Sequence, residues 1–198
     1  MAERSNAISE LTRFWLQAKH SCLIYESLPV PVRYNQSDID FLAIRGDLQR
    51  FPLPNGKAVG SRLIVETKDE HDWEPRGREF GQLLQADIEK MQDGLFVPRG
   101  TSCKFSMLRE EHYDKAVEFF GTDDFDRLFI VHALDTAVIE QYGEFLADKR
   151  ICILGISDLV ADLCKWYEEH PRRSGLRNTL TGDIWHLLVG FCGCKPNT

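Results

Sequence analysis

Two short apolar segments that carry charged residues constrain the fold of this chain more than any other feature. The segments are Ser37–Ile44 and Arg62–Lys68, and both are brief and contain β-branched residues. Segments of this length and composition are typical of β-strands. The interval between them is punctuated by turn-forming residues, namely Pro52, Pro54, Gly56 and Gly60. We therefore predict two neighbouring strands of one sheet, joined by a turn-rich connection.

The charges within these two strands fall on shared faces. Side chains two residues apart on a strand point the same way, so Asp38 shares a face with Asp40, and Glu66 shares one with Lys68. A carboxylate in an apolar strand is costly unless something pairs with it, and a divalent cation is a common partner. Asp40 directly precedes the apolar run Phe41–Ile44. We expect Asp40 to be the buried ligand and Asp38 to be a carboxylate at the strand end.

An Asp on one strand followed by Glu-x-Lys on the next resembles the PD-(D/E)XK nuclease superfamily, which includes restriction endonucleases and archaeal Holliday-junction resolvases. The resemblance implies that Asp40 and Glu66 bind Mg²⁺ or Mn²⁺ and that Lys68 positions or activates the attacking water. The carbonyl oxygen of Thr67 is a candidate third ligand. A lysine close to a metal is expected to have a lowered pKa, which would permit proton transfer near neutral pH. The chain departs from the family pattern at Ile39, where the family has Pro.

The resemblance also implies two further site residues, each with an alternative explanation. Many family members carry a Glu on the first helix, which here is predicted over Asn6–Ala18 and contains Glu10. Glu10 also suits a helix N-terminus as a carboxylate that interacts with the helix dipole. A Gln on the helix after the Glu-x-Lys strand often lies near the active site, and Gln85, or else Gln82, matches it. Either Gln is equally explained as a helix-favouring surface residue.

The rest of the chain alternates strands with helices. We expect an edge strand over Cys22–Tyr25 and Val30–Arg33, broken by Pro29 and Pro31. The further expected elements are a helix from Arg76, a helix over Leu108–Phe120 ended by Gly121, a strand over Asp126–Leu134 with His132 in the core, a helix over Thr136–Ala147, a strand over Ile151–Leu154, a helix capped by Ser157 and a last helix over Thr181–Phe191. This order predicts an α/β fold with a mixed sheet flanked by helices on both sides. With the resemblance, it implies a restriction endonuclease-like single domain over residues 1–198, with additional C-terminal helices. Its core lies at about 5–135, and a C-terminal α/β extension follows at about 136–198.

Net charge, apolar runs and cysteine spacing limit which binding partners the chain is expected to have. The chain has 198 residues and a net charge of −7, which argues against coating by nucleic acid but leaves room for a local basic groove. Basic residues beside the motif and near the C-terminus are Arg33, Arg45, Arg62, Arg76, Arg78, Arg99, Lys104, Arg172, Arg173 and Arg177. No apolar run has the length of a membrane span and the N-terminal residues do not resemble a signal peptide, so we expect a cytoplasmic protein with no membrane partner. Cys192 and Cys194 lack the second pair that a zinc site requires, and His71 fits a solvated loop better than a ligand.

These features favour a metal-dependent nuclease that hydrolyses phosphodiester bonds, with DNA as the preferred substrate and an endonuclease as the preferred type. The alternative is a catalytically idle module with the same fold that binds nucleic acid or protein. Serine-hydrolase and zinc-protease motifs are absent from the sequence. DNA or RNA, duplex, branched or single-stranded substrate, and monomer or homodimer all stay open at this point.

Overall fold

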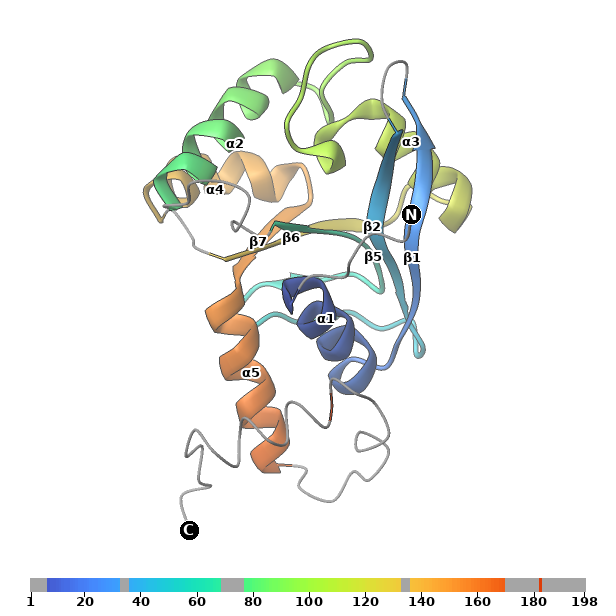
Figure 1. Cartoon of the computed structure of the whole chain (residues 1–198), viewed down its shortest axis with the longest axis vertical. Coiled ribbons are helices and arrows are strands. Elements are labelled where there is room, and N and C mark those ends of the chain that lie inside the picture. Colours follow the sequence, from blue (N-terminus) through green and yellow to red (C-terminus); the bar gives the residue numbers. More distant parts are fainter. Residues whose placement is uncertain (1–6, 33–35, 69–76, 133–135, 170–181, 183–198) are drawn as a thin grey trace.

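The computed structural model of the chain describes residues 7–32, 36–68, 77–132, 136–169 and 182. The helices and strands are α1 (Ala7–Phe14), a π-helical turn η1 (Trp15–Lys19), β1 (Cys22–Pro31), β2 (Gln36–Arg45), β3 (Phe51–Pro52), β4 (Ala58–Val59), β5 (Arg62–Lys68), α2 (Gly77–Met91), a 3₁₀ turn η3 (Ser106–Leu108), α3 (Glu110–Phe120), β6 (Asp126–Val131), α4 (Thr136–Asp148), β7 (Ile151–Gly155) and α5 (Ile156–Glu169). Figure 1 shows them arranged around one central sheet.

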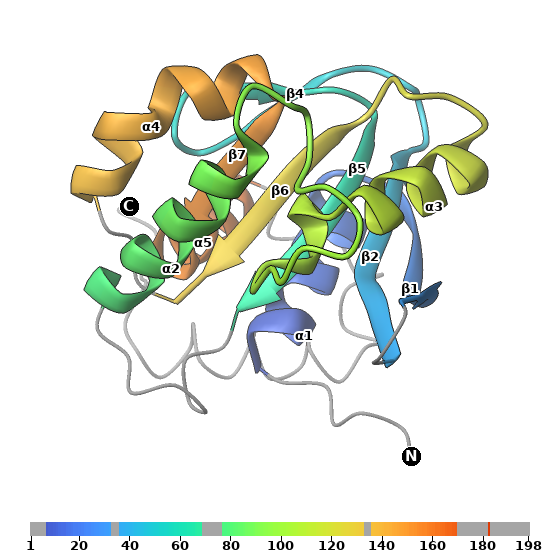
Figure 2. The same ribbon diagram turned by 90° about the horizontal axis from the view of Figure 1, so that it is seen from above.

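The central sheet is mixed and has five strands in the order β1-β2-β5-β6-β7. β1, β2 and β5 are antiparallel neighbours, whereas β6 lies parallel to β5 and β7 lies parallel to β6. The parallel strands are reached through helices, as parallel pairing requires. The predicted α/β fold with a mixed sheet and helices on both sides is therefore confirmed (Figures 1 and 2).

Each face of the sheet buries its own apolar cluster. On one face α2, α3 and α4 cover side chains such as Leu84, Phe105 and Phe129. On the other face α1 and α5 cover a second cluster, which includes Trp15 and Leu163. Every residue of β6 is buried, as expected for a central strand covered on both faces. β7 and α5 belong to this same sheet and core.

Three details differ from the sequence-based expectations. β1 is unbroken through Pro29 and Pro31, because it is an edge strand and one side of its backbone needs no ladder partner. The prediction of a core histidine at His132 is wrong: β6 ends at Val131, and the side chain of His132 is exposed. α5 begins at Ile156, one residue before the expected cap.

Several predicted features lie outside the described residues. They are the loop with His71, the helix expected over Thr181–Phe191, the cluster of Arg172, Arg173 and Arg177, and the pair Cys192 and Cys194. Within the described ranges, no helix combines the length and the apolar character that crossing a membrane requires.

Candidate active site

The predicted charged residues meet where β2 and β5 separate. Paired residues run from Ile44 and Arg62 to Phe41 and Val65, and the ladder between the two strands stops there. Two residues beyond Val65, the N–H of Thr67 donates to the carboxylate of Asp40 instead of to backbone, with an N–O distance of 2.7 Å. The Thr67 hydroxyl donates to the same oxygen at 3.0 Å. A side chain thus replaces the backbone partner at this end of the sheet.

The side chains of β2 stop alternating regularly between the two faces of the sheet at Asp40. Ile39 packs in the cluster under α2 and α3, whereas Phe41 packs in the cluster under α1 and α5. In a regular strand these two residues would share a face. The register with β1 skips the same position, because Glu26 pairs with Phe41 and Leu28 pairs with Ile39. The intervening Ser27 has a φ of 51°, in the left-handed region. This local irregularity is what turns the Asp40 carboxylate toward Thr67.

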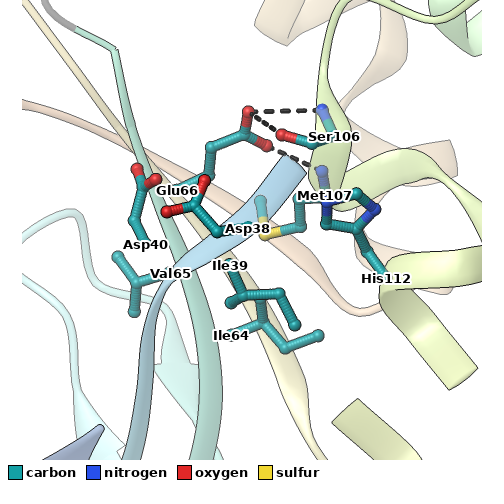
Figure 3. Close-up of a pocket in the computed structure, with 9 residues that line it drawn as sticks. All are labelled: Asp38, Ile39, Asp40, Ile64, Val65, Glu66, Ser106, Met107 and His112. Carbon is teal, nitrogen blue, oxygen red and sulfur yellow. Dashed lines mark hydrogen bonds between the residues drawn. The ribbon is translucent and has the colours of Figure 1, made fainter. Parts of the chain in front are cut away.

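A small pocket opens at this point (Figure 3). It is lined by Asp38, Ile39, Asp40, Ile64, Val65, Glu66, Ser106, Met107 and His112. The space that a water molecule can occupy inside it is about 10 Å³, which is enough for about one water, so most of the hydration shell of a bound cation would lie outside the pocket. A nucleotide is too large to enter it. A phosphate group would therefore bind at the mouth of the pocket.

Asp40 is half-buried beside a second carboxylate. Burial, followed by the negative charge of Glu66, raises the pKa of Asp40 from 3.8 to about 6, although the hydrogen bonds from Thr67 and the charge of Lys68 act in the opposite direction. Its other carboxylate oxygen accepts no hydrogen bond from the described residues. A cation near this oxygen would lower the pKa again, because opposite charge favours the ionised form.

Glu66 is more buried than Asp40, and its side chain is 5% exposed. Its Oε1 accepts from Lys68 at 2.5 Å, from the Ser106 hydroxyl at 2.9 Å and from the Ser106 N–H at 3.3 Å. Its Oε2 accepts from the Met107 N–H at 2.8 Å. Burial alone would raise the pKa of Glu66, but the charge of Lys68 and these hydrogen bonds outweigh it, so the pKa lies below its ordinary value. Glu66 is therefore ionised at neutral pH, and Oε2 keeps room for one more contact.

Lys68 shares the face of Glu66, as predicted, and its side chain is 23% exposed. Its ammonium group also lies 5.9 Å from the centre of the Phe105 ring. Burial lowers the pKa of Lys68, but the charges of Glu66, Asp40 and Asp38 exceed that effect and raise it. This differs from the lowered pKa expected beside a metal, because in this structure the charges around Lys68 are carboxylates. A Lys68 that keeps its charge suits orienting a water or neutralising a phosphate better than accepting a proton.

Two other pocket residues come from parts of the chain that the motif did not indicate. His112 of α3 is fully buried, and its Nε2 lies 2.9 Å from the Ser37 hydroxyl. Burial lowers the pKa of His112, so its ring is neutral at pH 7. Ser106 supplies donors to Glu66 from η3. Neither residue stands in a recognisable sequence pattern, and only the packing of η3 and α3 over the strand ends brings them to the pocket.

Lys68 and Thr67 contact Glu66 and Asp40 without lining the pocket themselves, and the remaining predicted residues lie away from it. Glu10 is paired with Arg13 one turn along α1, and it does not line the pocket. Its neighbour Ser9 approaches the Thr67 hydroxyl at 2.8 Å, on the α1 side of the sheet. Gln85 donates to Glu89 of its own helix at 3.0 Å, and Gln82 is exposed.

The residues present fit a hard cation bound through few protein ligands. In the described part of the chain, no cluster of three or more His, Cys, Asp or Glu residues has the geometry to hold a metal ion. Mg²⁺ is commonly bound through one or two carboxylates and keeps several waters, so a larger cluster is not required. The pKa of Asp40 is raised mainly by burial and then by the charge of Glu66, and a cation bound between the two carboxylates would act against both effects.

Comparisons with protein-family models, curated proteins and solved structures found no match to this chain.

Proposed function

We propose that the chain is a metal-dependent nuclease with a restriction endonuclease-like fold. The observation that carries the proposal is that Asp40 and Glu66, from two adjacent strands, line one pocket where the ladder between β2 and β5 ends, and that Lys68 pairs with Glu66 beside it. The order of elements supports it as well: a helix, a strand, a strand with Asp, a strand with Glu-x-Lys and a helix occur in this order, with the short strands β3 and β4 between the two charged strands. This is the order on which the resemblance to PD-(D/E)XK nucleases rests.

Asp40 and Glu66 would hold Mg²⁺ or Mn²⁺, each through an oxygen that still has room for a contact. The carbonyl of Thr67 is the proposed third ligand. Its N–H donates to Asp40 of β2, and the N–H and C=O of one residue in an extended strand point to the same side of that strand, so the carbonyl would face the β2 side as well. Bound there, the ion would supply positive charge against the phosphate and the attacking water.

Lys68 would carry the second positive charge of the site. Held by Glu66 and still partly exposed, its ammonium group can donate to a phosphate oxygen or to a water at the pocket mouth. Because its pKa is raised, Lys68 remains protonated at neutral pH and acts by orienting and neutralising rather than by removing a proton. The substrate of this proposal is nucleic acid, with DNA preferred.

A second candidate is an idle module of the same fold that binds nucleic acid or protein. The observation in its favour is the environment of Glu66, whose charge is already balanced by Lys68 and by three donors from Ser106 and Met107 without any metal. Against it, one oxygen of Asp40 has no donor among the described residues, and the carboxylate pair remains repulsive.

Two measurements on the intact chain separate these candidates. The first is Mg²⁺ binding by calorimetry, and the second is cleavage of supercoiled plasmid and of single-stranded DNA with Mg²⁺, with Mn²⁺ and with EDTA. The nuclease proposal expects both saturable binding and cleavage that EDTA abolishes. Nucleic-acid binding without metal binding and without cleavage would favour the idle module.

A further inference from the structure

The segment Cys103–Leu108 is fixed by two buried carboxylates that belong to different elements. Asp87 of α2 is 1% exposed and holds the first half of the segment, while Glu66 of β5 holds the second half. Asp87 Oδ2 accepts from the Lys104 N–H at 2.6 Å, the Phe105 N–H at 2.9 Å and the Cys103 thiol at 3.2 Å. The two carboxylates thus satisfy consecutive donors along one short stretch of backbone.

The middle of the segment is anchored by packing. Phe105, Met107 and Leu108 are all fully or almost fully buried. Arg109 donates to the Cys103 carbonyl at 2.5 Å, which closes the segment on itself. The Leu108 carbonyl accepts from the Val97 N–H at 2.6 Å, which ties the end of the segment to the preceding loop. A segment held in this way presents the donors of Ser106 and Met107 to Glu66 in one fixed arrangement.

We propose that Cys103–Leu108 is a clamp that positions Glu66 for the cation, with Ser106 and Asp87 as its positioning residues. The inference rests on the proposed function, because it assigns a role in metal binding to residues that touch neither cation nor substrate. Three donors leave the Glu66 carboxylate little freedom to rotate and direct Oε2 at its remaining contact. Hydrogen-bond partners of metal ligands act in this way, and their loss typically costs about 10- to 100-fold in metal affinity or activity.

The first test needs no metal and asks whether the two ends of the clamp are coupled. Amide hydrogen exchange is measured in the wild-type chain and in Asp87→Asn. The clamp predicts faster exchange at Lys104 and Phe105, which contact Asp87, and also at Ser106 and Met107, which contact Glu66. Unchanged exchange at Ser106 and Met107 would show that the two halves are independent and would overturn the role of Asp87.

The second test is Mg²⁺ binding by calorimetry in the wild type, Ser106→Ala, Ser106→Thr and Ser102→Ala, with the melting temperature of each. Ser102 is an exposed serine just before the clamp and serves as the matched control. The clamp predicts about tenfold or more weaker binding for Ser106→Ala, with wild-type affinity for the other two. Equal affinity of Ser106→Ala and the wild type would overturn the clamp while leaving the nuclease proposal in place.

Failure of the proposed function gives a different result. A wild-type chain that binds no Mg²⁺ overturns the nuclease proposal and the clamp together, and this is visible before any variant is made. If Ser106→Ala does not fold, the Mg²⁺ affinity of Asp87→Asn is compared with that of the wild type instead, because Asp87 holds the other end of the clamp. Weaker Mg²⁺ binding by folded Asp87→Asn supports the clamp, and wild-type affinity contradicts it.

Discussion

At the scale of single residues, Asp40 and Glu66 are two neighbouring carboxylates in unequal environments. Glu66 is stabilised as an anion by Lys68 and three hydrogen bonds, whereas Asp40 is left with two donors and the repulsion of its neighbour. Their pKa values consequently move in opposite directions. Such a pair marks a candidate functional site, because perturbed carboxylates cluster where charge is to be bound or moved.

Asp40 gives a prediction for the stability of the metal-free chain. Its pKa is about 6 in the folded state and 3.8 in the reference state, so the folded state holds more protons between these values. On account of this group, the free energy of unfolding falls as pH rises through that window. We expect Asp40→Asn to remove this contribution and to stabilise the metal-free chain at pH 7.5 by on the order of 1 to 3 kcal/mol.

Urea unfolding of the wild type and Asp40→Asn at pH 4.5 and pH 7.5 measures this contribution. Asp148→Asn, at an exposed position on α4, is the matched control. A variant that is less stable than the wild type at pH 7.5 would contradict the electrostatic account of Asp40.

For His20, at a position remote from the pocket, we predict the opposite pH dependence: the free energy of unfolding rises as pH rises. Its ring lies 4.4 Å from those of Trp15 and Phe51, and burial lowers its pKa from 6.5 to about 3. Below pH 6.5, His20 is therefore protonated in the unfolded chain but stays neutral in the folded chain. Stability associated with His20 is complete above pH 6.5 and is lost as pH falls toward 3, by up to roughly 1.4 kcal/mol per pH unit.

His20→Phe, which keeps an aromatic ring in this position, is expected to reduce the loss of stability between pH 6.5 and pH 4. The measurement is the free energy of unfolding in urea at several pH values across this range. Parallel curves for the wild type and the variant would show that His20 is not held neutral by burial.

At the scale of elements, the two central strands were predictable because their signal is local. The expected segments Ser37–Ile44 and Arg62–Lys68 correspond to β2 at Gln36–Arg45 and β5 at Arg62–Lys68. Brief β-branched runs between turn residues specify a strand wherever it is placed. The same locality explains the helix end at Gly121, whose φ of 67° suits glycine.

The irregularities at the site could not be read from the same patterns. A regular strand places Ile39 and Phe41 on one face, but they pack on opposite faces because β1 and β2 are distorted around Ser27 and Asp40. The donors that surround Glu66 come from Ser106 and Met107, which are 40 and 41 residues further along the chain. Contacts of that separation depend on how α2 and η3 pack, which no local pattern encodes. His132 was misassigned for a related reason, since the apolar run did not reveal where β6 ends.

At the scale of the whole molecule, the sheet and the helices on both of its faces form one body (Figure 2). The pocket opens where the ladder between β2 and β5 ends (Figure 3). The C-terminal elements are part of that body. β7 pairs with β6, and Leu163 and Trp166 of α5 lie in the same cluster as Trp15 of η1. Trp15 also donates to Asp162 of α5 at 2.9 Å. α5 therefore supports the face opposite the pocket, whereas α4 packs on the same face as α2 and α3.

Leu163→Ala tests this integration. The side chain of Leu163 is fully buried, so its truncation should cost about 2 to 5 kcal/mol of unfolding free energy in a single cooperative transition. Lys165→Ala, at an exposed position on the same helix, should have little effect. Urea unfolding followed by both fluorescence and circular dichroism checks this. A separate unfolding transition of α5 at lower urea concentration would mean that the C-terminal elements fold independently of the other elements.

The central claim is that Asp40 and Glu66 would hold a cation and that these residues, with Lys68, support the hydrolysis of a phosphodiester bond by water. Glu66→Ala is a poor probe of it, because that change would also leave the donors of Ser106 and Met107 unpaired. Asp40→Asn is cleaner, since we expect the variant to be more stable than the wild type. A loss of activity in it could not be attributed to unfolding.

The most direct measurement is therefore the rate of Mg²⁺-dependent plasmid cleavage by the wild type, Asp40→Asn and Lys68→Ala, each shown to be folded. We predict cleavage by the wild type, none above background for Asp40→Asn, and a rate lower by about 10²- to 10⁴-fold for Lys68→Ala. Equal rates in all three proteins, or no cleavage by the wild type with Mg²⁺ or Mn²⁺, would contradict the account.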